Sequence, residues 1–206
     1  MAQLYNFQEV NEGTSCKTIL GFVSPGSRVL EFGPATGYMT KFMQEQLHCK
    51  VTCIELIPEM AQLTSQYAEK MIVADIDLGE WEKELDGTYD YIIFADVLEH
   101  LRSPGKAIQK SMKYLSANGC MLTSIPNIGH NAVIMSLLKG KFEYTNDGLL
   151  DDTHIHFFTR QSMRDMFEKE GLICIAEKSR IRRPSSTEFQ EFYIKKPCMA
   201  LFLIRT

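Results

Sequence analysis

The sequence predicts an α/β fold: one domain with a doubly wound, seven-stranded, mostly parallel sheet. Strand patterns alternate with helix patterns from Arg28 onward, an order typical of parallel sheets covered by helices. The first strand runs into a glycine-containing turn that opens a helix, which is where such folds bind ligands. The 206 residues suit a single domain, because domains commonly span about 100 to 200 residues. We therefore expect residues 1–206 to form one domain.

Residues 1–26 are expected to form a helical cap on this domain. Ile19, Leu20 and Phe22 give weak helical periodicity, and the Ser-Pro-Gly sequence at 24–26 is a turn signal just before the first strand. A segment this short is a cap rather than a second domain.

Apolar runs bounded by turn residues predict the strands of the sheet. They cover residues 28–32, 50–55, 71–74, 90–95, 120–125, 172–176 and 199–205. Apolar residues at helical spacing predict the helices between them, at about 37–47, 58–69, 105–115 and 160–169.

Local signals mark several of these helix ends. Pro58 lies near the first turn of its helix, and Thr159 is a typical N-cap for the helix that follows it. Asn118-Gly119 is expected to stop the helix at 105–115, and Gly171 the helix at 160–169.

Residues 128–158 are too long for a plain connection after the fifth strand. They combine a short apolar helix, expected at 132–138, with acidic, aromatic and histidine residues. Long insertions of this kind commonly carry function, so we expect this one to lie on the substrate side.

Composition excludes several classes of protein. Hydrophobic residues make up 45% and charged residues 23% of the chain, which is ordinary for a globular protein and excludes a disordered or fibrous one. The net charge of −4 disfavours a nucleic-acid partner, which usually needs a clustered basic face. Lys178, Arg180, Arg182 and Arg183 form a basic cluster, interpreted as a solvated strand end and loop, with phosphate contact as the alternative.

The cysteines predict free thiols. They show no C-x-x-C pair, and they lie at positions 16, 49, 53, 120, 174 and 198. The chain has no charged-then-apolar leader and no apolar run near the ~18 residues that a membrane span requires. A cytoplasmic protein with no membrane span is expected.

The turn after the first strand is the most informative part of the chain. Its glycines, Gly33 and Gly37, let the backbone approach a ligand closely, but their spacing differs from the G-x-G-x-x-G of dinucleotide sites. Glu31, two residues before the first glycine, would repel a pyrophosphate and attract a cation. S-adenosylmethionine, with its sulfonium and ammonium groups, fits this arrangement.

Residues 29–37 resemble the first motif of the class I S-adenosylmethionine-dependent methyltransferases. One position departs from that family, since Ala35 stands where glycine is common. The resemblance implies a Rossmann-like methyltransferase fold, with the last strand inserted antiparallel, and it places Ala35 with the glycines at the cofactor. It covers about residues 27 to 175.

The ends of the second and third strands continue the resemblance. Glu55 ends the second strand, where a carboxylate can accept hydrogen bonds from both ribose hydroxyls, and Leu56 beside it is assigned to the same site. A dehydrogenase would place an acid similarly, so Glu55 alone does not separate the two classes. Asp75 and Ile76 match the family positions for the adenine amino group and ring.

The fourth and fifth strands end on polar residues. By the same resemblance, Asp96 should lie beside the methionine half of the cofactor, and Asn127 should line the opening through which the acceptor arrives. Capping of the next helix is an equally open role for Asn127.

Asp96-x-x-Glu99-His100 resembles the phrase by which small-RNA 3′-end 2′-O-methyltransferases and some ubiquinone-pathway O-methyltransferases hold a divalent cation. Two carboxylates and an imidazole within one turn can converge on an ion. The Glu-His pair is also widespread in methyltransferases without metal, where it anchors the helix. We therefore treat a divalent cation as an alternative and do not favour a metal site.

Residues 149–159 resemble a segment of bacterial methyltransferases linked to surface-polysaccharide synthesis and of ubiquinone O-methyltransferases. His154 is the candidate general base, because imidazole titrates near neutrality, and Asp152 is expected to orient it. His156 would face the same side in an extended chain, so it is a candidate substrate residue. The structural alternative is a histidine that only forms hydrogen bonds with loop carbonyls.

We therefore expect transfer of a methyl group from S-adenosylmethionine to a hydroxyl of a small molecule or sugar, by a monomer or homodimer. Three rivals stay open: a catalytically silent cofactor-binding protein, a nicotinamide-dependent dehydrogenase, and a methyltransferase acting on nitrogen or on nucleic acid. Glu31 and the missing third glycine disfavour the dehydrogenase, and the absence of a basic face disfavours the nucleic-acid enzyme.

Overall fold

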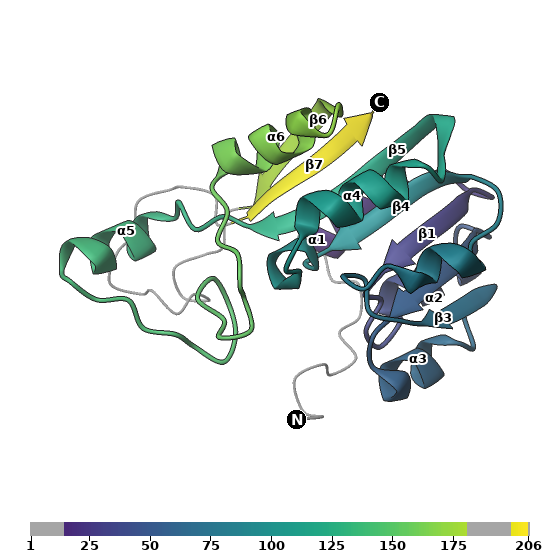
Figure 1. Ribbon diagram of the computed structural model, residues 1–206, viewed down its shortest axis with the longest axis horizontal. Coiled ribbons are helices and arrows are strands. Elements are labelled where there is room, and N and C mark those ends of the chain that lie inside the picture. Colours follow the sequence, from purple (N-terminus) through teal and green to yellow (C-terminus); the bar gives the residue numbers. More distant parts are fainter. Residues whose placement is uncertain (1–14, 181–198, 206) are drawn as a thin grey trace.

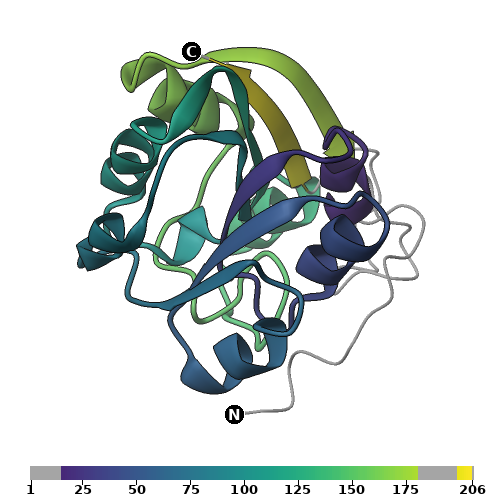
Figure 2. The same cartoon turned by 90° about the vertical axis from the view of Figure 1, so that its right-hand side faces the viewer.

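A computed structural model describes residues 15–180 and 199–205 of the chain. Its sheet has the strand order β3-β2-β1-β4-β5-β7-β6, with helices on both faces (Figures 1 and 2). Strands β1 to β5 run parallel, and β7 lies antiparallel between β5 and β6. The parallel, Rossmann-like arrangement and the antiparallel last strand are both confirmed.

The strands begin and end close to the positions that the sequence predicts. Their bounds are β1 Arg28–Phe32, β2 Lys50–Glu55, β3 Lys70–Val73, β4 Tyr89–Ala95, β5 Leu115–Pro126, β6 Ile173–Arg180 and β7 Met199–Arg205. Successive residues of β1 and β2 are buried on opposite faces, because helices cover both sides of the sheet.

The helices have the bounds α1 Ser15–Leu20, α2 Tyr38–Glu45, α3 Pro58–Thr64, η1 Glu80–Glu84, η2 Leu98–His100, α4 Pro104–Met112, α5 Asn131–Leu138 and α6 Arg160–Lys169. Helices α2, α3 and α4 are shorter than the sequence patterns suggest, by up to several residues, whereas α6 has the predicted bounds and α5 begins one residue earlier than predicted. Thr159 caps α6 as predicted, in a reciprocal pair of hydrogen bonds with Ser162. Gly171, with φ +82°, follows the end of α6.

One predicted helix end is wrong. Asn118 and Gly119 lie inside β5, which starts at Leu115, and not at the end of α4. The chain turns earlier, where the Tyr114 amide donates to Ser111, and Leu115 then pairs with Tyr89 of β4. Asn118 is exposed in this first part of β5, so the Asn-Gly pair needs no helix-ending role.

The two faces of the sheet bury separate cores. Phe32 and Phe94 stack with ring centroids 4.3 Å apart under α4, α6 and the buried Trp81 of η1. The opposite face packs against α1 and α2, through residues such as Ile19 and Met43. Residues 1–14 of the predicted cap lie outside the described residues, as do Arg182, Arg183 and Cys198 of the sequence analysis.

The insertion after β5 extends beyond the end of the sheet toward which β4 and β5 point (Figure 1). It has a small core of its own, formed by Val133, Leu149 and Leu150. Thr145 pairs with Leu150 and Asp152 through backbone hydrogen bonds of 2.9 and 3.0 Å, which close the loop on itself. Within the described part of the chain, no helix is both long and apolar enough to cross a membrane.

Candidate functional site

The turn after β1 is held in a conformation that suits glycine. Gly33 and Gly37 have φ of +63° and +76°, in the left-handed region. A Cβ on Gly33 would lie 2.8 Å from a methyl of Val97, and a Cβ on Gly37 would lie 2.6 Å from Thr64 Oγ1. These contacts bring Val97, which follows β4, and Thr64 of α3 against the turn, so the glycines set its shape as well as its access to a ligand.

Ala35 adopts the left-handed conformation without being glycine, with φ +50°. This conformation costs an L-residue roughly 1–2 kcal/mol, and hydrogen bonds on both sides hold it. The Ala35 amide donates to Glu55 Oε2 at 3.0 Å, and Thr64 Oγ1 donates to the Ala35 carbonyl at 2.7 Å. The departure from the family pattern is therefore accommodated by β2 and α3.

Glu55 lies at the end of β2, where the sequence places it, and is 6% exposed. Its two oxygens accept one backbone hydrogen bond each, from Ala35 and from Ile57. A carboxylate offers about four lone-pair positions, so room remains for hydroxyl donors. Leu56 beside it is 58% exposed, an apolar side chain that an adenosine could cover.

Glu31 is further inside the protein than the sequence suggests. It is 2% exposed on the α2 face of β1, and its Oε2 accepts a 2.7 Å hydrogen bond from Thr40 Oγ1. Burial raises its pKa from 4.5 to about 7, while hydrogen bonds from Thr40 and Cys53 oppose the shift. Its charged and neutral forms are therefore both populated near neutral pH, and Thr40 is a partner that sequence reasoning missed.

Asp75 and Ile76 follow β3 and separate in environment. Asp75 is half-buried and its Oδ1 accepts from the Asp77 amide at 2.8 Å, in a local turn. Ile76 is 8% exposed and packs in the core, with its carbonyl bound by the Trp81 indole. Asp75 keeps its position at the carboxyl edge of the sheet, whereas Ile76 acts chiefly as a core residue.

The ends of β4 and β5 carry Asp96 and Asn127. Asp96 has φ +53° and its Oδ1 accepts from Ser124 Oγ at 3.1 Å, so two neighbouring strands fix it. Asn127 is 7% exposed and its Oδ1 accepts from the Gly129 amide at 3.0 Å. Asn127 therefore has a structural role in a local turn, but it does not cap the next helix, because His130 is the N-cap of α5.

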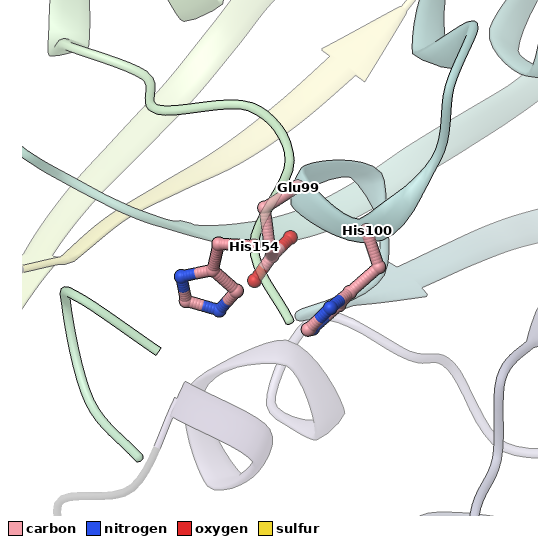
Figure 3. Close-up of side chains that lie close together, drawn as sticks. All are labelled: Glu99, His100 and His154. Atoms are coloured by element: carbon pink, nitrogen blue, oxygen red, sulfur yellow. The ribbon is translucent and has the colours of Figure 1, made fainter. Parts of the chain in front are cut away.

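The side chains of Glu99, His100 and His154 come together, although about fifty residues of chain separate His154 from the other two. One ligand atom from each lies within 4.8 Å of the others, and the Glu99 carboxylate lies between the two imidazole rings (Figure 3). The His100 and His154 ring centroids are 4.8 Å apart, nearly edge to face. Two amides of the insertion, those of Ile155 and His156, donate to the Glu99 carbonyl and hold the segments together.

The buried polar atoms of this cluster lack hydrogen-bond partners. Glu99 is 1% exposed with neither carboxylate oxygen bonded, and His154 Nδ1 is buried and unbonded. Burial raises the pKa of Glu99 well above its usual range, and the Asp96 carboxylate raises it further. Burial and the neighbouring His100 lower the pKa of His154, so His154 is neutral at pH 7 and Glu99 favours its protonated form.

This donor set fits a divalent cation. One carboxylate and two imidazoles are ligands that transition metals accept, and a bound ion would satisfy the unbonded Glu99 oxygens. Asp96, named with Glu99 and His100 by the sequence, bonds Ser124, and His154 completes the cluster instead. The sequence phrase could not show that the insertion supplies this third ligand.

Asp152 and His156 lie apart from the cluster. Asp152 is exposed, and Asp151 is the acid whose charge acts on His154. His156 Nε2 lies 3.3 Å from the Arg102 carbonyl, a loop contact of the kind that the structural alternative describes. His154 and His156 thus occupy different environments, because the segment turns at His154, whose amide donates to Asp151.

Comparison with known proteins identifies the family of the chain. The family model described as "Methyltransferase domain" matches residues 11–177. A ubiquinone biosynthesis O-methyltransferase from Xanthomonas campestris pv. campestris is 24% identical over 178 residues, covering 80% of this chain and 73% of the relative.

Solved structures of methyltransferases share the fold. Magnesium protoporphyrin IX methyltransferase from Synechocystis, solved with bound S-adenosylhomocysteine, has a TM-score of 0.67 at 15% identity, covering 98% of this chain and 91% of that one. An S-adenosylmethionine-dependent methyltransferase from Mesorhizobium loti has a TM-score of 0.67 at 14% identity, covering 94% and 99%. The chain therefore belongs to the methyltransferase-domain family.

Proposed function

We propose that this protein methylates a hydroxyl group of a small molecule. The observation that carries the proposal is the cluster of Glu99, His100 and His154, at the end of β4 next to Asp96. An alcohol must lose its proton during methyl transfer, whereas a neutral amine needs no base beforehand. A buried, neutral imidazole at this position suits O-methylation, and distant relatives named ubiquinone biosynthesis O-methyltransferases support the same class of reaction.

The residues at the strand ends would hold the cofactor. Glu55 would accept from the ribose hydroxyls, Leu56 and Asp75 would contact the adenine, and the turn from Gly33 to Gly37 would lie under the methionine portion. When bound, S-adenosylmethionine supplies an electrophilic methyl group. The chain's part is to align the acceptor with that group and to exclude water, and alignment can contribute up to ~7–11 kcal/mol in favourable systems.

His154 would act as the general base. Its Nδ1 is buried without a hydrogen-bond partner, and its lowered pKa keeps it unprotonated at neutral pH, which leaves it able to take the acceptor's proton. A positioned base of this kind is typically worth about 10²- to 10⁴-fold in rate.

A divalent cation on Glu99, His100 and His154 is the second way to activate the hydroxyl. A cation lowers the pKa of a hydroxyl that it coordinates, and these three residues would be its ligands. The unbonded Glu99 oxygens favour this candidate, whereas the raised pKa of Glu99 opposes it, because burial disfavours the charged carboxylate that would bind the ion. We favour the base without a metal.

The test measures methyl transfer from labelled S-adenosylmethionine to a panel of phenols and sugars, with and without EDTA. His154→Ala should lower turnover by at least ~10²-fold while its affinity for S-adenosylhomocysteine is unchanged, and EDTA should have no effect. His48→Asn is the matched control, since His48 is exposed just before β2, at the opposite edge of the sheet.

Each other outcome identifies a rival. Loss of activity with EDTA and its return with Mg²⁺ or Mn²⁺ would favour the cation. Binding of S-adenosylhomocysteine without transfer to any acceptor would favour a silent cofactor-binding protein, and transfer only to amines would favour N-methylation. Saturable binding of NAD with no heat from S-adenosylhomocysteine would refute the cofactor site itself.

A further inference from the structure

Residues 97–103, which we call the η2 segment, lie between the two sides of the proposed site. The segment follows β4, contains η2 and leads into α4. On one side it contacts the turn after β1 and the chain after β3, where the proposed function places the cofactor. On the other side it contacts the part of the insertion that carries His154. The η2 segment therefore connects the cofactor side with the acceptor side.

A carboxylate from the cofactor side holds the end of the η2 segment. Asp77 follows β3 and is half-buried. Its Oδ2 accepts from the Arg102 amide at 2.8 Å, and its Oδ1 accepts from the Ser103 amide at 3.0 Å. Ser103 is the N-cap of α4, so Asp77 also places a negative charge at the start of a helix, where the helix dipole favours it. One side chain thus fixes the end of the η2 segment and the start of α4.

Asp77 is joined to the residue that we assign to the adenine. The Asp77 amide donates to Asp75 Oδ1 at 2.8 Å, so the two acids belong to one tight turn. An adenine amino group that donates to the Asp75 carboxylate would restrict the motion of this turn. The Asp77 carboxylate, two residues away, would then be held more firmly against the η2 segment. Ordering of one site that prepares a second site is a recognised form of coupling, and it needs no large movement.

The insertion is attached to the other side of the η2 segment. The amides of Ile155 and His156 both donate to the Glu99 carbonyl, at 3.0 and 3.1 Å. His156 Nε2 also lies 3.3 Å from the Arg102 carbonyl. Arg102 therefore donates to Asp77 through its amide and contacts His156 through its carbonyl. Motion of the η2 segment is transmitted through these contacts to the part of the insertion that carries the proposed base.

Figure 3 shows the result of this arrangement at the proposed acceptor side. The side chains of Glu99 and His100, from the η2 segment, lie beside that of His154, from the insertion. Their relative placement depends on how the insertion is seated on the η2 segment, because no covalent link nearby joins the two. A residue that fixes the η2 segment therefore also fixes the position of His154.

We propose that Asp77 is a positioning residue that couples the cofactor side of the site to the acceptor side. Cofactor binding at Asp75 fixes the η2 segment through Asp77, and the η2 segment then holds the insertion in place for the acceptor. This coupling rests on the proposed function, which supplies the roles of Asp75 and of the insertion. Its consequence is an order of binding, in which the acceptor binds well only after the cofactor.

A purely structural role for Asp77 makes a different prediction. Hydrogen bonds from backbone amides to a carboxylate stabilise the fold whether or not the cofactor is bound. Removing them would then lower the stability of the protein without changing how the insertion responds to the cofactor. The response of the insertion to the ligand, and not stability, therefore distinguishes the two roles.

The experiment measures amide hydrogen exchange, by mass spectrometry and NMR, with and without saturating S-adenosylhomocysteine. Two groups of amides are followed. Those of the turn at residues 33–37 report on occupation of the cofactor site, and those of Ile155 and His156 report on the seating of the insertion. S-adenosylhomocysteine is the probe because it carries the adenine group and leaves the acceptor side unoccupied.

Three variants are compared with the wild type. Asp77→Ala removes both acceptor oxygens, whereas Asp77→Asn keeps one and replaces the other by a donor. Asp90→Ala is the matched control, since Asp90 Oδ2 also accepts from a backbone amide of another strand, that of Arg28, at 2.9 Å. This bond lies where β1 and β4 begin, at the opposite end of these strands from the site.

In the wild type and in Asp90→Ala, S-adenosylhomocysteine should slow exchange of the Ile155 and His156 amides by about fivefold or more, the lower end of the usual coupling between two sites. In Asp77→Ala most of this slowing should be lost, while the turn at residues 33–37 is protected as in the wild type. Asp77→Asn should lie between them. Both alanine variants should be less stable than the wild type, so lower stability does not account for the difference.

The two groups of amides separate failure of the coupling from failure of the proposed function. If S-adenosylhomocysteine protects neither group in the wild type, the proposed function fails and the coupling with it. If it protects the turn but not Ile155 and His156, or if Asp90→Ala loses the response as Asp77→Ala does, only the coupling is refuted. A wild-type response in Asp77→Ala refutes it as well. If Asp77→Ala does not fold, Asp77→Asn decides: an undiminished response refutes the coupling, and a reduced one supports it.

Discussion

Replacing Glu31 by glutamine should make the protein more stable and its cofactor binding weaker. Glu31 is 2% exposed on the central strand β1, where burial raises its pKa from 4.5 to about 7. Glutamine keeps an oxygen for the Thr40 hydroxyl, which donates to Glu31 at 2.7 Å, and never ionises. The substitution therefore isolates the cost of holding a carboxylate there.

The direction in which stability changes with pH follows from the pKa values of Glu31 in the unfolded and folded states. Below pH 4.5 the carboxyl is protonated in both states; as the pH rises the unfolded chain ionises first, so the free energy of unfolding falls until about pH 7. Each unit of pKa shift corresponds to about 1.36 kcal/mol. The shift from 4.5 to about 7 therefore lowers the free energy of unfolding by about 3 kcal/mol at pH 8. At pH 5 the loss is under ~1 kcal/mol.

Urea unfolding at pH 5 and pH 8 measures this loss directly. We expect the free energy of unfolding of Glu31→Gln to be higher than that of the wild type, and the difference to be about 2 kcal/mol larger at pH 8 than at pH 5. The melting temperature of the variant at pH 8 should be roughly 6–12 °C higher than that of the wild type. Comparing two pH values removes any constant effect of the amide. Glu99 titrates in both proteins, so it cancels.

Cofactor binding gives the second readout. An ionised Glu31 beneath the turn attracts the sulfonium of S-adenosylmethionine, which S-adenosylhomocysteine lacks. Glu31→Gln should therefore lower the affinity for S-adenosylmethionine at pH 8 by about tenfold, and the affinity for S-adenosylhomocysteine by less. A variant with the pH dependence of the wild type, or with equal losses for both ligands, would refute the reasoning.

Two further substitutions test the cofactor turn. Glu55→Ala should weaken S-adenosylhomocysteine binding by roughly 1.5–3 kcal/mol by calorimetry, the usual worth of hydrogen bonds to a charged group, and an unchanged affinity would remove Glu55 from the site. Gly37→Ala should lower the free energy of unfolding by at least ~1–2 kcal/mol in urea, because φ is +76° and the new Cβ would meet Thr64 at 2.6 Å. Gly140→Ala, at φ +72° with open space around it, is the control that separates the contact with Thr64 from backbone strain.

The sequence predicted the strands better than the helix ends. Strands such as Lys50–Glu55 and Met199–Arg205 are apolar runs bounded by polar residues. Burial on both faces leaves Lys50–Glu55 little freedom of register. The prediction that Asn118-Gly119 ends a helix was wrong because the same pair suits both a helix end and an exposed strand position. The pairing of Leu115 with Tyr89 of β4 places the pair in a strand.

The sequence predicts the residues of the candidate site that lie at fixed positions along the chain relative to the strand ends. Gly33, Gly37 and Glu55 stand at fixed distances from strand ends, so a motif can find them. The packing of His154 against Glu99, and of Phe142 against Phe157, joins segments that no spacing relates. Such contacts depend on how the insertion folds, which one sequence does not reveal.

β7 is the last strand in the sequence but lies inside the sheet, so the sheet can be completed only after β7 has been synthesised. β1 to β4 are neighbours in the sheet and occupy residues 28–95, so the strands that carry Glu31, Glu55 and Asp96 can pair as soon as that stretch has left the ribosome. In the sheet order, β6 reaches β5 only through β7, which spans Met199–Arg205. β6 therefore cannot join the sheet until β7 arrives, so a nascent chain that already has its turn after β1 would still lack this edge of the sheet.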